Sequence, residues 1–283
     1  MESKVIGVIG AGIMGSGIVQ VCAQAGLSVV MVDVSAAAID RGFSAINSSL
    51  DRLVAKGRLA EADKTSAVAR IKGTTSYEDL ANCDVVIEAA TESEGLKLNI
   101  LKQIDAVVRA DAVIASNTSS ISISKLASAI KHPERFIGMH FFNPVPVMAL
   151  VELITGLQTA GETLERAKAL ATAIGKTPIS AKNSPGFAVN RILCPMINEA
   201  IFALQEGLAT AEDIDQGMKL GANHPIGPLA LADMIGLDTM LSVMETFYAG
   251  FNDPKYRPAP LLREMVDSGR LGRKSGHGFY KYS

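Results

Sequence analysis

The fold is decided by the stretch Val5-Ile6-Gly7-Val8-Ile9-Gly10-Ala11-Gly12-Ile13-Met14-Gly15. Its first five residues form an apolar run. The glycine-rich turn that follows leads into residues spaced as on a helix, among them Val19, Val21 and Cys22. A strand, a glycine turn and then a helix are the context in which a G-x-G-x-x-G motif binds a dinucleotide. We therefore expect a dinucleotide-binding loop here.

Each glycine of the motif has its own physical reason. Gly10 permits a tight turn, Gly12 lets the backbone approach a pyrophosphate closely, and Gly15 lets the helix pack against the strand. The N–H groups at the start of the helix, near Ile13 and Met14, have no partner within the helix and attract negative charge. These five residues are the predicted cofactor contacts of the loop.

A second apolar run, residues 29–32, ends in Asp33, about 20 residues beyond the glycines. A carboxylate at this place accepts hydrogen bonds from a ribose 2′-hydroxyl and repels a 2′-phosphate, which favours NAD. The alternative for Asp33 is a solvated residue at a strand end. Ser35 and Arg41 lie nearby and leave NADP open as a second cofactor.

The composition excludes several classes of protein. With 283 residues, 48% of them hydrophobic, the chain can bury a core large enough for two domains. A net charge of −2 gives no basic field for nucleic acid. No apolar run approaches the ~20 residues of a membrane span, and no signal peptide is recognisable. The cysteines lack ligand-like spacing. We expect a cytoplasmic protein without disulfides, metal, or nucleic-acid or membrane partners.

The first part of the chain alternates short apolar runs with helix-like segments, a pattern typical of a parallel sheet covered by helices on both faces. Residues 36–69 form a long helical stretch interrupted near Gly57, which predicts a helical hairpin. The further predicted strands are residues 84–88, 112–116, 136–140 and 150–154, and a helix is expected over residues 96–108.

The segment Lys182-Asn183-Ser184-Pro185-Gly186 predicts a domain boundary, because proline and glycine interrupt regular structure. We expect a Rossmann-type doubly wound α/β domain over residues 1–184 and an all-helical substrate-binding domain over residues 185–283. Helices are predicted over residues 188–207, 211–220, 229–251 and 258–268. The apolar residues of this second part fill either a local core or a dimer interface, and they include Ile192, Ile197, Ile201, Leu204, Leu237, Leu241 and Met244.

Four polar residues lie where a parallel sheet binds its ligands. Ser119 follows a predicted strand, His140 ends the next one, and Glu152 lies in the strand after that. Asn190 opens the first helix beyond the boundary. Because ligands bind outside the carboxyl ends of parallel strands, we expect the four residues to converge on a cleft between the two domains.

Such a set supports the oxidation of an alcohol. A hydride leaves a carbinol carbon as the hydroxyl proton is removed, and a histidine with a pKa of ~6.5 suits that proton transfer. Glu152 would hold the tautomer of His140 and stabilise the imidazolium. Ser119 and Asn190 would donate hydrogen bonds to the substrate oxygen.

Each residue also has a structural interpretation. Ser119 and Asn190 are typical helix caps, and His140 could be a buried histidine satisfied by a backbone carbonyl. Glu152 stands within Leu150-Val151-Glu152-Leu153-Ile154, where a carboxylate among buried apolar residues needs a partner.

Taken together, the motifs resemble the L-3-hydroxyacyl-CoA dehydrogenases, most closely the short bacterial forms that act on (S)-3-hydroxybutyryl-CoA. The resemblance covers essentially the whole chain, and the block from His140 to Pro144 is its most specific part. The matching motifs are the glycine loop, Ser116-Asn117-Thr118-Ser119-Ser120, His140-Phe141-Phe142-Asn143-Pro144, Gly186-Phe187-Ala188-Val189-Asn190-Arg191 and Gly272-Arg273-Lys274-Ser275-Gly276.

The resemblance implies a reversible NAD-dependent oxidation to acetoacetyl-CoA, with His140 as base or acid paired with Glu152, and Ser119 and Asn190 as ligands of the substrate oxygen. It also implies a homodimer built on the helical domain. Coenzyme A would contact Ser49 and Lys56 on the helical hairpin, unless Lys56 belongs to an ordinary solvated face. The implied NAD contacts are Asp33, Glu92, Lys97, Ser119, Asn143 and Lys274.

Three other interpretations compete with this one. Dehydrogenases of the 3-hydroxyisobutyrate or 6-phosphogluconate type have a catalytic lysine four residues before an asparagine. In this chain the residue four positions before Asn190 is Gly186. Sugar-acid dehydrogenases of the gulonate type carry a similar His and Glu pair but need no coenzyme A contacts at Ser49 and Lys56. A nucleotide-binding structural protein, as some related lens crystallins are, would need none of the four polar residues.

Overall fold

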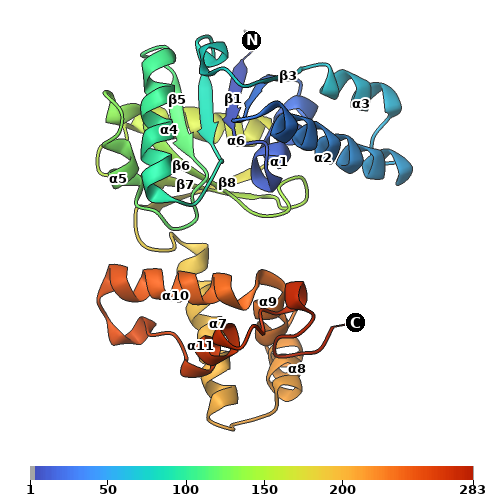
Figure 1. The fold of residues 1–283 in the computed structure, drawn as a ribbon, viewed down its shortest axis with the longest axis vertical. Helices are drawn as coiled ribbons and strands as arrows, with labels where there is room; N and C mark the ends of the chain where they lie inside the picture. The colour runs from blue at the N-terminus through green and yellow to red at the C-terminus, as the bar shows by residue number, and fades with distance from the viewer. Residues whose placement is uncertain (1–3, 283) are drawn as a thin grey trace. The chain divides into compact units, whose positions relative to one another are not determined.

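The computed structural model describes residues 4–282 and divides into two compact units, one ending at Asn183 and the other beginning at Ser184. The division falls one residue before the boundary expected from the sequence. The first unit is an α/β unit and the second is helical (Figure 1), so the predicted fold class is confirmed.

The described part of the first unit contains one eight-stranded sheet, with strand order β3-β2-β1-β4-β5-β6-β7-β8. The strands are β1 (Val5–Ile9), β2 (Ser28–Val32), β3 (Ile71–Thr74), β4 (Val85–Glu88), β5 (Val113–Ser116), β6 (Phe136–Phe141), β7 (Leu150–Thr155) and β8 (Thr177–Lys182). The helices are α1 (Ile13–Gln24), α2 (Ala36–Ala55), α3 (Glu61–Val68), α4 (Glu94–Val107), α5 (Ile123–Ala127) and α6 (Gly161–Ala173). Short 3₁₀ turns occur at Tyr77–Leu80 and Pro133–Arg135.

The sheet is parallel, as expected, except at one edge. Strands β1 to β6 are parallel, but β7 pairs with β6 in the antiparallel direction and β8 follows β7 in parallel. The connection between β6 and β7, residues 142–149, contains no helix. A parallel connection between neighbouring strands needs a crossover of a dozen or more residues. This loop is shorter, so it reverses the chain and places β7 antiparallel to β6.

The two faces of the sheet carry different kinds of residue. Helices α1, α2 and α6 share one apolar core with residues such as Ile87 and Met139, whereas α4 and α5 lie on the other side of the sheet (Figure 1). Successive strand residues point to opposite faces. Glu88, Ser116 and His140 therefore lie on the face of α4, and this face carries the buried polar groups of the sheet.

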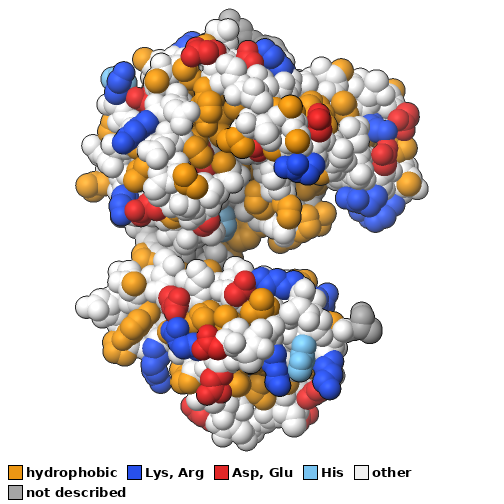
Figure 2. All heavy atoms as spheres, in the orientation of Figure 1, with side chains coloured by type: hydrophobic (Ala, Val, Ile, Leu, Met, Phe, Trp, Pro, Cys, Tyr) orange, Lys and Arg blue, Asp and Glu red, His pale blue; other side chains and the backbone are white. Residues whose placement is uncertain are grey.

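The predicted helical hairpin is confirmed as α2 and α3. Gly57, with φ +65°, ends the first helix and turns the chain. Ile46 and Leu50 of α2 are buried against the sheet unit, and Lys64 of α3 joins Asp51 of α2 at 2.5 Å. The outer surface of the hairpin carries both basic and acidic side chains (Figure 2).

The second unit consists of α7 (Val189–Gln205), α8 (Ala211–Gly221), α9 (Pro228–Ile235), α10 (Leu237–Phe251) and α11 (Pro260–Asp267), with 3₁₀ turns at Pro254–Tyr256 and Arg273–Ser275. The single helix expected over residues 229–251 is wrong, because Gly236 has φ +102° and separates α9 from α10. None of the helices in the described part of the chain is long and apolar enough to cross a membrane.

The apolar residues considered for a dimer interface mostly fill the core of the second unit. Ile197, Ile201, Leu237, Leu241 and Met244 are buried, and Leu204 packs against them. Ile192 is the exception, with 73% of its surface exposed. The local-core interpretation therefore holds for all of these positions but Ile192.

Candidate active site

The glycine loop has the geometry that its sequence predicts. Gly10 has φ +101°, and its N–H donates to the Val32 carbonyl at 2.8 Å, which ties the loop to β2. A side chain at Gly15 would overlap the Gly10 carbonyl, so the loop and α1 are in contact at this point. Within the described residues, no side chain caps the start of α1 and no acidic residue lies in its first turn. The N-terminal N–H groups thus remain suited to an anion.

Asp33 holds the same loop from the end of β2. Its Oδ2 accepts a hydrogen bond from the Ala11 N–H at 2.7 Å, and its Oδ1 accepts one from the Val34 N–H at 2.7 Å. Gly12 is exposed, with open space where a side chain would stand. An open glycine, a helix start without a cap and an acid at the end of β2 form a site that fits the pyrophosphate and adenosine ribose of NAD.

His140 and Glu152 meet across the antiparallel pair of β6 and β7. The two residues are directly opposite in register, and Nδ1 of His140 lies 2.8 Å from Oε2 of Glu152. His140 is 6% exposed and Glu152 is fully buried. A carboxylate buried in this way needs a charged or hydrogen-bonded partner, and the imidazole is one.

Two contacts fix the end of β6 around this pair. The ring of Phe142 lies 4.5 Å from the ring of His140, between centroids. Asn117, in the loop after β5, accepts the N–H of Phe141 through its Oδ1 at 2.9 Å. The neighbouring parallel strands β5 and β6 are therefore joined at their carboxyl ends, where the sheet offers its ligand site.

Glu92 organises the loop that carries Ser119. Its Oε1 accepts hydrogen bonds from the Thr118 hydroxyl at 2.6 Å, the Ser119 N–H at 2.8 Å, the Ser119 hydroxyl at 3.1 Å and the Ser120 hydroxyl at 3.2 Å. Ser119 does not cap the helix that follows, since Ser122 is the N-cap of α5. The helix-cap interpretation of Ser119 is thus wrong.

Lys97 lies in a buried polar cluster beside this loop. Its ammonium is 2.6 Å from Oε2 of Glu88 and 3.3 Å from the hydroxyl of Ser116, and 3.7 Å from Oε2 of Glu92. Lys97 is 1% exposed and Glu88 is fully buried. The cluster joins α4 to the ends of β4 and β5 and positions Glu92. The sequence contains a signal for it, because Lys97 lies on the same stripe of α4 as the buried Leu101 and Ile104.

Three further predicted contacts lie at the surface of the first unit. Asn143 is exposed in the loop after β6. Ser49 is half-buried in the last turns of α2, and Lys56 is exposed at the end of that helix. The cations Arg52 and Arg58 are exposed on the same end of the hairpin.

The second unit carries the remaining two predicted residues. Asn190 is half-buried in the first turn of α7, whose N-cap is Ala188, so Asn190 does not cap that helix. The ammonium of Lys274 lies 2.6 Å from the carboxylate of Asp238. Burial raises the pKa of Asp238, but the hydrogen bonds from Lys274 and from backbone N–H groups, together with the charge of Lys274, outweigh burial and hold this pKa below its ordinary value.

The C-terminal motif around Lys274 is folded onto a buried aspartate. Asp233, fully buried in α9, accepts the N–H groups of Phe279 and Tyr280, both at 3.0 Å, and the hydroxyl of Tyr282 at 2.9 Å. A side chain at Gly278 would overlap its carboxylate. Sequence reasoning missed Asp233, although a lone acid within an apolar helix is a detectable signal.

Comparison with known proteins identifies the class to which this fold and site belong. The model of the 3-hydroxyacyl-CoA dehydrogenase NAD-binding domain matches residues 5–184, and that of the C-terminal domain of the same enzymes matches residues 186–282. The chain therefore belongs to the 3-hydroxyacyl-CoA dehydrogenase family and is an NAD-dependent oxidoreductase, as the resemblance of its motifs implies.

The similarity extends over whole chains. A probable 3-hydroxybutyryl-CoA dehydrogenase of Deinococcus radiodurans is 54% identical over 98% of this chain and 99% of its own. The 3-hydroxybutyryl-CoA dehydrogenase of Bradyrhizobium diazoefficiens is 52% identical over 99% and 95%. The crystal structure of the (S)-3-hydroxybutyryl-CoA dehydrogenase of Ralstonia eutropha is 65% identical, covers 100% of both chains and superposes with a TM-score of 0.98.

Proposed function

We propose that this enzyme reversibly oxidises (S)-3-hydroxybutyryl-CoA to acetoacetyl-CoA with NAD, and that His140 is its general base and acid. The observation that carries the proposal is the buried hydrogen bond between His140 and Glu152 at the carboxyl end of β6. The choice of the four-carbon substrate is supported by the relatives named above, which cover nearly the whole chain.

The pair performs the proton transfer. NAD, when bound at the glycine loop and Asp33, supplies the acceptor for the hydride of the substrate carbon. Glu152 accepts from Nδ1 of His140, so the other ring nitrogen, Nε2, is directed away from the carboxylate. Nε2 takes the substrate's hydroxyl proton in the oxidation and returns it in the reduction. The buried carboxylate stabilises the imidazolium in between.

Ser119 and Asn190 are the proposed ligands of the substrate oxygen. The Ser119 hydroxyl donates to Glu92 at 3.1 Å, so it must turn from Glu92 in order to donate to a ketone oxygen. The amide of Asn190 supplies the second donor from the first turn of α7. Two donors aimed at the oxygen stabilise the negative charge that develops on it.

The remaining contacts are proposed from the resemblance of the motifs and from the placement of their residues. Glu92, Lys97, Asn143 and Lys274 complete the NAD site, Lys97 by holding Glu92 and the end of β4. Coenzyme A binds along α2 at Ser49 and Lys56. We also propose a homodimer formed through the second unit, whose exposed apolar side chains include Ile192, Leu208, Leu220 and Met234.

The test is the consumption of NADH and of NADPH with acetoacetyl-CoA, followed by nicotinamide absorbance. We expect His140→Ala to lower kcat by about 10²–10⁴ while NADH binding is retained. The matched control is His132→Ala, since His132 forms an exposed pair with Glu134 at 3.2 Å. Parental turnover in His140→Ala would contradict the role of His140, and the absence of turnover in the parent would contradict the substrate.

A further inference from the structure

Lys176 is a buried cation that the proton and hydride transfers do not use. It follows α6 directly before β8, is 8% exposed, and donates to the backbone carbonyls of Val145 at 2.5 Å and Met148 at 2.8 Å. Burial lowers the pKa of Lys176, and the thiol of Cys22 is the titratable group that faces it. Among the described residues its hydrogen-bond partners are thus carbonyl oxygens, which do not compensate the positive charge as a carboxylate would.

Both carbonyls belong to the connection between β6 and β7, residues 142–149, here called the β6–β7 loop. This loop joins the strand of His140 to the strand of Glu152. Its first residue, Phe142, packs against the ring of His140, and Asn143 follows. At its other end the Ala149 carbonyl accepts the N–H of Thr177 at 2.8 Å.

The middle of the loop also touches the dinucleotide-binding helix. A side chain at Gly17 of α1 would overlap Val145, so Val145 lies directly against that helix. Lys176 binds the carbonyl of this same residue. One ammonium therefore fixes a loop that contacts α1 on one side and His140 on the other.

We propose that Lys176 is a positioning residue for the dehydrogenase reaction: its two hydrogen bonds hold the β6–β7 loop so that Phe142 supports the His140 ring and Asn143 is presented to NAD. The inference rests on the proposed roles of His140 and Asn143. Lys176 itself touches neither the substrate nor the cofactor.

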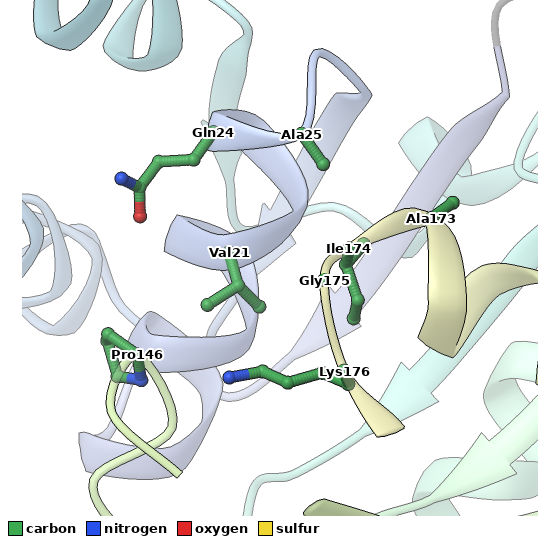
Figure 3. A pocket seen from close by; sticks show the side chains of 8 residues that line it. All are labelled: Val21, Gln24, Ala25, Pro146, Ala173, Ile174, Gly175 and Lys176. Atoms are coloured by element: carbon green, nitrogen blue, oxygen red, sulfur yellow. The ribbon is translucent and has the colours of Figure 1, made fainter. Parts of the chain in front are cut away.

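The presence of a lysine at this position supports a role in hydrogen bonding to the loop rather than in filling space. An ammonium costs free energy on burial, whereas methionine fills a similar volume without that cost. What lysine adds is a set of N–H donors on a long stem, which bridges two carbonyls of one loop. Figure 3 shows the stem reaching from the start of β8 toward Pro146, beside an open pocket that Val21 and Ile174 also line.

The pocket permits a direct test, because a small amine can enter where the lysine stem is removed. We would compare Lys176→Met, Lys176→Ala and the control Lys168→Met, which alters a half-buried lysine of α6 paired with Glu165. The readouts are kcat and KM for NADH and for acetoacetyl-CoA, the melting temperature, and hydrogen exchange of the loop amides measured without turnover.

We expect Lys176→Met to lower kcat/KM for NADH by about tenfold to a hundredfold and to speed amide exchange at Val145 and at residues 147–149. Added n-butylammonium should restore part of the activity of Lys176→Ala, while n-butanol, of similar size without charge, should not. Lys168→Met should match the parent.

Parental kinetics in Lys176→Met, or unchanged exchange in the loop, would overturn the proposal, as would equal restoration by the alcohol. If Lys176→Met does not fold, the restoration experiment on Lys176→Ala decides. Because the exchange measurement needs no turnover, it separates a failure of Lys176 as a support from a failure of His140 as the base.

Discussion

His140 and Glu152 form one unit, because the antiparallel register of β6 and β7 sets them directly opposite each other with 2.8 Å between Nδ1 and Oε2. Neither side chain can move far, since both are buried and each belongs to a strand that is paired on both sides. We propose that Glu152 thereby determines which nitrogen of the imidazole carries the proton.

The first prediction is that the effects of removing the two residues are not additive. Glu152→Gln should lower kcat by about a hundredfold or more, because an amide does not stabilise the imidazolium. The double variant His140→Ala, Glu152→Gln should be no slower than His140→Ala alone, as expected of residues that act together. Steady-state kinetics of the four enzymes measures this, with Glu134→Gln as the control on an exposed His–Glu pair. Multiplying losses would show that the residues act independently.

The second prediction concerns Asp33, for which we expect two roles, one in holding the glycine loop and one in the choice of cofactor. It accepts the Ala11 N–H of the glycine loop, and from its place at the end of β2 we expect it to repel a 2′-phosphate. Asp33→Asn should therefore raise the KM for NADH by about tenfold, which is the expected cost of losing one charge-assisted hydrogen bond. It should also reduce the preference for NADH over NADPH. The measurement is the ratio of kcat/KM for the two cofactors, with Asp40→Asn on α2 as the control. An unchanged ratio would remove Asp33 from the choice of cofactor.

The third prediction concerns the interaction of Glu92 with the Ser119 loop. Glu92→Ala removes the acceptor shared by Thr118, Ser119 and Ser120, so the loop should lose its fixed conformation and kcat should fall by about tenfold or more. Glu92→Gln keeps an acceptor oxygen and should lose less. The control is Glu94→Ala, because Glu94 pairs with Lys125 outside the loop. If alanine and glutamine have equal effects, the charge of Glu92, rather than its acceptor, is what matters.

The strands with a clear apolar pattern could be predicted from the sequence, whereas the two edge strands of the sheet could not. The strands β1, β4, β5 and β6 are apolar runs and are buried as expected. The edge strands β3 and β8 were missed, because Ile71-Lys72-Gly73-Thr74 is short and polar and β8 is largely exposed and contains Pro178. Edge strands carry a weaker apolar pattern, since they have a neighbour on one side only.

The candidate site shows the same division. The residue types of His140, Glu152 and Ser119 and their places at strand ends pointed to alcohol chemistry. The direction of β7 did not follow from hydropathy, because an apolar run reads the same in either direction, and only the length of the loop before it limits the choice. The hydrogen bonds of Glu92 join segments that are far apart in sequence, and those of Lys176 are made to backbone carbonyls. Neither kind of contact leaves a pattern in the sequence.

The fourth prediction tests the coenzyme A contacts proposed on α2. The exposed cations Arg52 and Lys56 lie in the last turn and at the end of the helix, and phosphate groups are what such cations bind. Lys56→Ala should raise the KM for acetoacetyl-CoA by up to about fivefold, the upper end of the range for one exposed ion pair, and leave the KM for acetoacetyl-pantetheine unchanged. Lys72→Ala, which alters an exposed lysine paired with Asp79, is the control. Equal changes with both thioesters would place the effect of Lys56 elsewhere than on the nucleotide part of coenzyme A.

The fifth prediction is that the second unit loses stability in alkali through two tyrosines of its C-terminal segment. Burial, together with the hydrogen bond to Asp215, raises the pKa of Tyr280, and burial with the hydrogen bond to Asp233 raises the pKa of Tyr282. A tyrosine whose pKa in the folded state lies above the ordinary value of ~10 contributes stability that is fully present below that pH. This stability is lost as the pH rises through the folded-state pKa, because the unfolded chain releases its proton first.

The free energy of unfolding should therefore fall above about pH 10, with a slope of up to ~1.4 kcal/mol per pH unit for each tyrosine. Denaturant titrations between about pH 8 and pH 11 would measure this slope in the parent and in Tyr280→Phe and Tyr282→Phe. Each substitution should lower stability near neutrality and flatten the alkaline slope, whereas Tyr248→Phe, at a half-exposed position of α10, should change neither. A slope that persists in the double variant Tyr280→Phe, Tyr282→Phe would mean that other groups govern alkaline unfolding.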